Sequence, residues 1–86
     1  MGKKEQKEKI KEEIKKFIFD NFMRGKGALK DNTALFENNL LDSFGILELS
    51  SFIEKKFKVT INPSDVTVEN FNSVDKIANF IMKKMK

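Results

Sequence analysis

Residues 39–49 read Asn-Leu-Leu-Asp-Ser-Phe-Gly-Ile-Leu-Glu-Leu, and this stretch predicts a helix that begins after a loop. Asp42 is a favourable N-cap, because its side chain can accept a hydrogen bond from a free backbone N–H of the first turn. Ser43 follows in that turn, and its hydroxyl is expected to be exposed because the apolar stripe of the helix lies on another face. The free N–H groups and the helix dipole there favour negative charge, so a phosphodiester on the Ser43 oxygen would be well placed.

Apolar residues recur at helical spacing in three segments of the chain. The spacing predicts one helix from about residue 5 to residue 22, a second from Asp42 or Ser43 to about residue 57, and a third that is capped by Ser73. Residues 67–71 can form one short helical turn. The three stripes consist of Ile10, Ile14, Phe17, Ile18 and Phe22; of Ile46, Leu49, Ile53 and Phe57; and of Val74, Ile77, Phe80 and Ile81.

The segments between these helices are predicted to be loops. Gly25 and Gly27 end the first pattern, so residues 24–41 are expected to form a long loop. A loop of that length is unusual in a small domain unless it packs or functions. Five apolar side chains are expected to hold it across the core: Leu29, Leu35, Phe36, Leu40 and Leu41.

Residues 59–61 favour an extended connector, since one isolated strand is not stable. Pro63 then breaks the chain. The prediction is therefore an all-α fold: a small antiparallel bundle of three to four helices with a long first loop. It forms a single domain over residues 1–86, in which residues 1–4 are expected to be disordered.

Composition excludes several classes of function. The 86 residues include no Cys, His, Trp or Tyr. The absence of Cys and His removes the commonest metal ligands, the usual general base and a thiol nucleophile. No metal site and no catalytic residue are expected, so the chain is predicted to be a binding, carrier or adaptor domain and not an enzyme.

Charge is distributed unevenly along the chain. The net charge is +4, but residues 1–30 carry +5, residues 31–54 carry −5 and residues 55–86 carry +4. The basic start leaves open an alternative function, a small basic helical interaction or nucleic-acid-binding module without a prosthetic group. Lys and Glu are interleaved there, however, as on a solvated helix face. No signal segment or spanning helix is evident, so a cytoplasmic protein with no membrane association is expected.

At residues 35–82 the chain resembles the acyl and peptidyl carrier proteins. The resemblance begins with the Asp42-Ser43 pair, followed by Leu47-Glu48-Leu49. It continues through residues 52–61, Asp65 and the segment Glu69-Asn-Phe-Asn-Ser-Val-Asp-Lys-Ile77. An Asp-Ser pair alone is weak evidence for this family. The pair followed in this order by the segment over residues 69–77 is strong evidence for it.

The resemblance implies a cofactor and a set of partners. Ser43 would receive 4′-phosphopantetheine from a phosphopantetheinyl transferase, and Asp42 would cap the helix and help that enzyme to recognise the site. An acyl or aminoacyl group would then be carried as a thioester, loaded by an adenylating enzyme and passed to condensing or acyl-transfer enzymes. No nucleic-acid partner is implied, and a monomer is expected. The residues expected to contact partners are Phe44, Leu47, Glu48, Ser51 and Glu54.

The sequence departs from the pattern of fatty-acid carriers, which are commonly strongly acidic. Lys55, Lys56 and Lys58 lie where those proteins often have carboxylates. This favours a freestanding carrier of a specialised pathway. D-alanyl carrier proteins share the Leu-Leu-Asp-Ser stretch, although their later segment is less similar to residues 69–74. Fatty acyl, polyketide, aminoacyl and D-alanyl groups thus all remain open as cargo. Small side chains at Ser50 and Ser51 are expected to leave space beside the core.

Overall fold

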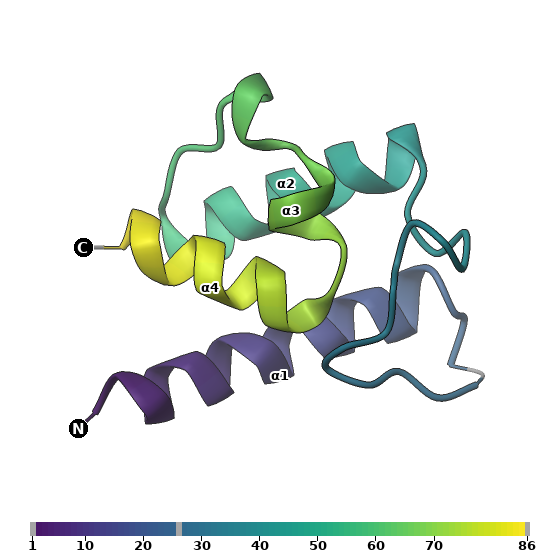
Figure 1. The fold of residues 1–86 in the computed structure, drawn as a ribbon, viewed down its shortest axis with the longest axis horizontal. Coiled ribbons are helices and arrows are strands. Elements are labelled where there is room, and N and C mark those ends of the chain that lie inside the picture. Colours follow the sequence, from purple (N-terminus) through teal and green to yellow (C-terminus); the bar gives the residue numbers. More distant parts are fainter. Residues whose placement is uncertain (1, 26, 86) are drawn as a thin grey trace.

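The computed structural model describes residues 2–25 and 27–85 and contains no strand within them. Its elements are α1 (Lys3–Asn21), α2 (Ser43–Phe57), the 3-10 helix η1 (Pro63–Asp65), α3 (Val68–Phe71) and α4 (Val74–Lys84). In Figure 1, α1 runs in the direction opposite to α2 and α4, and its N-terminus lies on the same side of the molecule as the C-terminus. The predicted all-helical bundle is confirmed.

Each α-helix after the first begins at a polar N-cap whose side chain accepts a backbone N–H. Asp42 accepts from Gly45 at 2.7 Å, Thr67 accepts from Asn70 at 3.2 Å, and Ser73 accepts from Lys76 at 3.1 Å. These caps satisfy donors that the first turn leaves free. The predicted starts of α2, α3 and α4 therefore match the structure to within a residue.

The start of α1 is different, because Gly2 provides no side-chain cap. The helix nevertheless begins at Lys3, inside the stretch of residues 1–4 that was expected to be disordered. Met1, the first residue of that stretch, lies outside the described residues.

The core is formed by the predicted stripes with some redistribution. Ile10, Ile14 and Ile18 of α1 meet Leu49 and Ile53 of α2 and the apolar face of α4, with exposed fractions of at most a few per cent. The outer members of the predicted stripes are only partly buried: Phe17, Phe22, Ile46 and Phe57. Four residues outside the main stripes are buried in the core instead: Leu35, Leu41, Phe71 and Ala78.

The long connection between α1 and α2 lies across the core, as predicted. Asn72, a buried residue between α3 and α4, holds it with two hydrogen bonds. Its backbone oxygen accepts from the Leu35 N–H at 2.7 Å, and its side-chain oxygen accepts from the Phe36 N–H at 3.0 Å. Because Leu35 is fully buried beside this contact, the segment that leads into α2 has a fixed path.

A second contact joins this connection to α1 and α4. The carboxylate of Asp31 lies 2.6 Å from Lys15 Nζ and 2.9 Å from Lys11 Nζ, and its backbone oxygen accepts from the Asp75 N–H. Hydrogen bonds from Lys15 and then Lys11 lower the pKa of Asp31. Hydrogen bonds to Glu8 and Asp31 raise the pKa of Lys11.

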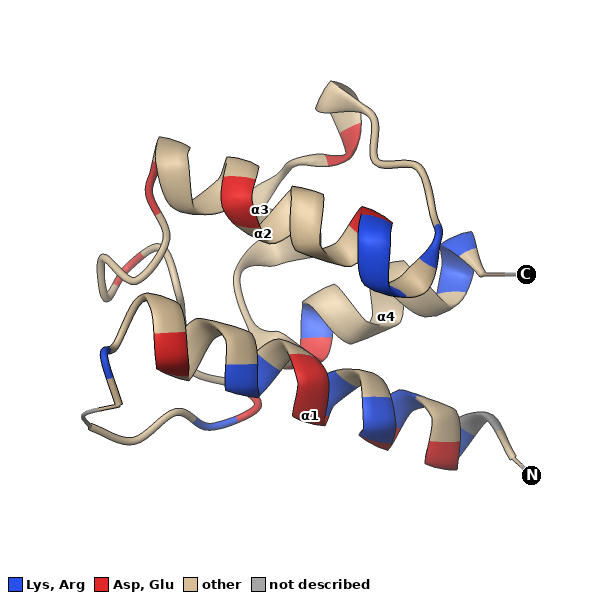
Figure 2. Cartoon of the chain, turned by 180° about the vertical axis from the view of Figure 1, so that it is seen from behind, with Lys and Arg blue, Asp and Glu red and all other residues tan. Residues whose placement is uncertain are grey.

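These ion pairs use part of the basic charge of α1. Lys7 also lies 3.0 Å from Asp75 at the start of α4. Figure 2 shows basic and acidic segments alternating along α1, with no long basic run on the face in view. The first helix is therefore a mixed-charge surface that contributes to holding the fold together, in line with the interleaved pattern of Lys and Glu in its sequence.

Candidate functional site

The start of α2 presents Ser43 to solvent. Asp42 is the N-cap: its side chain accepts from Gly45 N–H, and its backbone oxygen accepts from Ile46 N–H at 2.9 Å. Ser43 is the first residue of the helix, is exposed, and takes no part in the cap. The simple structural explanation for a serine at this point, that it caps the helix, therefore does not apply.

Gly45 allows close packing around this turn. A Cβ atom at this position would lie 3.3 Å from the Asp42 carboxylate and 3.5 Å from side-chain atoms of Leu41 and Phe22. Glycine normally weakens a helix interior. Here it is buried and leaves room for the capping carboxylate, the preceding loop and the end of α1.

A groove of about 550 Å³ begins at Ser43 and follows α2 toward its C-terminus. One wall is α2, and the other is the connector after α2 together with η1. The groove is lined from α2 by Ser43, Ile46, Leu47, Ser50, Ser51 and Glu54, and from the opposite wall by Ile61, Asn62, Pro63 and Val66. It combines apolar side chains with hydroxyl, amide and carboxylate groups.

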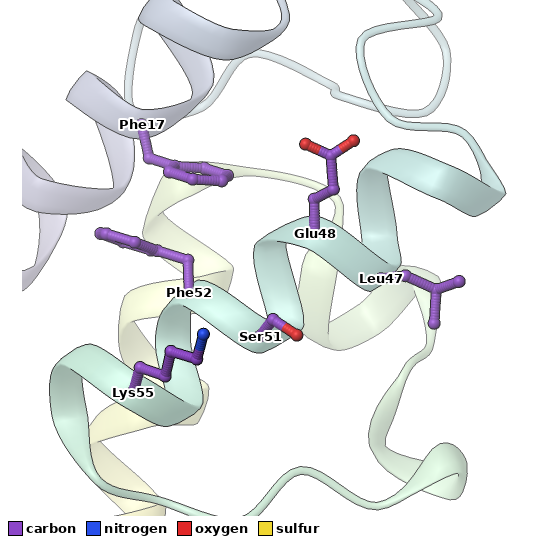
Figure 3. Close-up of a pocket in the computed structure, with 6 residues that line it drawn as sticks. All are labelled: Phe17, Leu47, Glu48, Ser51, Phe52 and Lys55. Carbon is purple, nitrogen blue, oxygen red and sulfur yellow. The ribbon is translucent and has the colours of Figure 1, made fainter.

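A second groove, of about 440 Å³, lies between α2 and α1 (Figure 3). It is lined by Leu47, Glu48, Ser51 and Lys55 of α2 and by a pair of aromatic rings. Those rings, Phe17 and Phe52, are stacked with centroids 4.4 Å apart. Figure 3 shows the Glu48 carboxylate and the Leu47 side chain pointing away from the stacked rings.

Of the five residues expected to contact partners, four line the two grooves that flank α2, and Phe44 lies outside both linings. Phe44 and Leu47 are strongly exposed, at 77 % and 66 %. Leu47 and Ser51 line both grooves, while Glu48 lines only the one beside α1 and Glu54 only the one beside η1. Glu54 is half-buried, and its carboxylate accepts from the Ile61 N–H at 2.9 Å.

Several groove residues were not singled out as site residues from the sequence: Ile46, Ser50, Ile61, Asn62, Pro63 and Val66. Those on the connector and η1 gave no local signal, because only the turn of the chain after α2 brings them opposite Ser43. For the residues of α2, the spacing in the sequence does indicate a shared side of the helix. Leu47, Ser50 and Glu54 follow Ser43 at intervals that place all four on one side of a helix.

Over residues 2–25 and 27–85, every helix is too short or too polar to span a bilayer. In the same residues, no group of three His, Cys, Asp or Glu side chains is arranged to hold a metal ion.

Comparison with curated proteins finds relatives over most of the chain. A D-alanyl carrier protein of Streptococcus suis (strain 05ZYH33) is 32 % identical over 76 residues, which are 88 % of this chain and 95 % of the relative. An acyl carrier protein of Buchnera aphidicola subsp. Acyrthosiphon pisum is 32 % identical over 75 residues, covering 87 % and 91 % of the two chains. The chain belongs to the acyl and D-alanyl carrier protein family.

Another relative of this carrier protein is the probable acyl carrier protein PigG of Serratia sp. (strain ATCC 39006), 31 % identical over 77 % of each chain. No family model matches the sequence. Carrier proteins are not themselves enzymes, which agrees with the prediction that this chain catalyses no reaction. The relatives give no support to the alternative of a nucleic-acid-binding module.

Proposed function

We propose that this carrier protein holds 4′-phosphopantetheine on the Ser43 oxygen, as a phosphodiester, and delivers acyl or aminoacyl cargo to partner enzymes. The observation that carries the proposal is the exposed Ser43 hydroxyl at the first position of α2, beside an Asp42 side chain that already caps the helix. A modifying enzyme could therefore reach the hydroxyl without breaking the cap.

The residues around Ser43 fit such a group. The N–H groups of the first turn and the dipole of the 15-residue helix favour a negatively charged phosphodiester. The adjoining groove offers both apolar side chains and hydrogen-bonding groups to a long polar chain. When bound, the group supplies the thiol that carries cargo as a thioester, a function that this chain cannot provide because it has no Cys.

The exposed apolar side chains beside Ser43 fit contacts with partner enzymes. Phe44 follows Ser43 directly, and Leu47 lies one turn further along α2. Large exposed apolar residues of this kind are typical anchors of protein interfaces. We propose that a phosphopantetheinyl transferase, a loading enzyme and acyl-transfer enzymes use these two side chains in turn. Tethering would raise the local concentration of cargo at each active site.

Intact-mass measurement tests the modification of Ser43. The purified chain is incubated with coenzyme A and a broad-specificity phosphopantetheinyl transferase, and a mass gain of one phosphopantetheine is expected. Ser43→Ala should abolish the gain, whereas Ser64→Ala, which removes an exposed hydroxyl of η1, should leave it intact. A wild-type chain that several transferases leave unmodified, or modification of Ser43→Ala, would refute the proposal.

A further inference from the structure

One side of α2 carries a row of residues that starts at Ser43 and continues through Leu47, Ser50 and Glu54. All four line the groove of about 550 Å³ between α2 and η1. Glu54 lies eleven positions after Ser43, which corresponds to about 16 Å along a helix. The groove thus leads from the proposed attachment point to a carboxylate at its other end.

The hydroxyl of Ser50, midway along this row, is buried and has no hydrogen-bond partner in the described part of the chain. Buried polar groups in proteins are nearly always hydrogen-bonded, and each exception calls for an explanation. A serine hydroxyl can donate one hydrogen bond and accept two. An amide or carbonyl group bound in the groove would provide the missing partner.

The carboxylate of Glu54, at the end of the row, is only partly used. One oxygen accepts the Ile61 N–H at 2.9 Å, which fixes the side chain against the connector. Among the side chains that the structure describes, in residues 4–25 and 27–85, Glu54 forms no ion pair. A half-buried carboxylate held in this way can still accept hydrogen bonds from a cation, and such charge-assisted bonds are strong.

The core beneath the groove is filled by apolar side chains. Leu49 and Ile53, which precede Ser50 and Glu54 in the helix, are fully buried, as is Phe71 of α3. Protein cores are close-packed, so extra methylene groups would have to displace these side chains. Cargo that stays outside this packed core would lie along the groove, where Ser50 and Glu54 offer polar groups.

We propose that this groove recognises an aminoacyl cargo, with Glu54 pairing with its ammonium group and Ser50 hydrogen-bonding to an amide that precedes it. The inference rests on the proposed function, because it requires the prosthetic group on Ser43. That group has about a dozen bonds between phosphorus and sulfur, or roughly 16 Å when extended at the spacing of a polypeptide backbone. The length matches the distance along α2 from Ser43 to Glu54.

The experiment compares two cargoes that differ only in the ammonium group. Isotope-labelled protein is modified at Ser43 with analogues of coenzyme A that end in an alanyl or a propionyl group, joined by a stable amide. Amide ¹H–¹⁵N spectra of the two products are then compared. We expect the alanyl form to shift the amide signals of Ser50, Glu54 and Ile61 relative to the propionyl form.

Variants assign the effect to individual side chains. Glu54→Gln keeps a hydrogen-bond acceptor for Ile61 but removes the charge, so the difference between the alanyl and propionyl forms should disappear. Glu48→Gln is the matched control, because Glu48 lines only the groove beside α1, and the difference should persist. Both loaded forms should shift amide signals near Ser50 relative to the unmodified protein. Ser50→Ala should make these shared shifts smaller.

The possible outcomes separate this inference from the function on which it rests. Failure to add either analogue would refute the modification of Ser43 and, with it, the inference. Successful addition with identical spectra for the two cargoes would refute the inference alone. A difference that survives Glu54→Gln, or that is lost in Glu48→Gln, would also refute it, because the ammonium would then be recognised elsewhere.

Discussion

Replacing Asn72 by Ala is expected to destabilise the protein strongly through a single hydrogen bond. The Asn72 side chain accepts the Phe36 N–H, which lies 36 positions away in the sequence and is partly buried. Alanine removes the acceptor but keeps the backbone oxygen that binds the Leu35 N–H. The partly buried Phe36 N–H then loses its one hydrogen-bond partner in the described part of the chain.

The size of the effect follows from the cost of an unpaired polar group. Leaving a buried donor unsatisfied costs about 1–3 kcal/mol, so we expect a loss of about 2 kcal/mol in the free energy of unfolding. In a domain of this size 1 kcal/mol corresponds to a change of about 4–8 °C in Tm. The Tm of Asn72→Ala should therefore fall by about 8–16 °C.

Thermal and urea unfolding followed by circular dichroism measure this loss. Hydrogen exchange provides a local test, because the Phe36 amide should exchange faster in the variant, while the Leu40 amide, which donates to the Leu35 oxygen, should change less. Asn79→Ala, at an exposed position of α4, is the control and should not lower the Tm. If the Tm of Asn72→Ala stayed within about 3 °C of the wild type, the reasoning would be wrong, since even the low end of the expected cost predicts more.

Substitutions at three further positions test other parts of the structure. Asp42→Ala should lower the free energy of unfolding by about 1 kcal/mol in urea titrations, because it removes the cap on the Gly45 N–H, whereas Asp42→Asn should retain most of it. Asp31→Asn should cost at most about 1 kcal/mol at pH 7, since the carboxylate is 39 % exposed. The pKa of Asp31 is lowered in the folded protein, so the carboxylate stabilises the fold above about pH 4, and this stabilisation is lost as the pH falls through the folded pKa. In thermal melts from pH 7 to pH 2, the difference in Tm between Asp31→Asn and the wild type should therefore shrink. Phe44→Ala should leave the Tm unchanged but lower kcat/KM for transferase modification of Ser43 about tenfold, an unchanged kcat/KM being the contrary result.

The local elements of this protein could be predicted from the sequence because each depends on neighbouring residues. N-caps act within three residues, and apolar stripes act over a few helical turns. Asp42, Thr67 and Ser73 therefore mark the starts of α2, α3 and α4 correctly. The exposure of Ser43 follows from the same local pattern.

Local sequence patterns could not predict the groove, nor which of the two grooves each predicted partner residue lines. The position of Glu54 depends on the Ile61 N–H, and the closing wall of the groove comes from residues 61–66 after the chain has turned back on α2. The role of Asn72 likewise depends on a partner half the chain away.

Contacts between near neighbours set the starts of α2, α3 and α4, the apolar stripes and the exposed hydroxyl at the head of α2, so these features could be predicted from the sequence. The polar groups that line a common groove, and the Asn72 contacts that tie the long loop to the core, are seen only in the folded structure. Those relations join residues that are distant in the chain, and their energies arise only when packing brings the groups together.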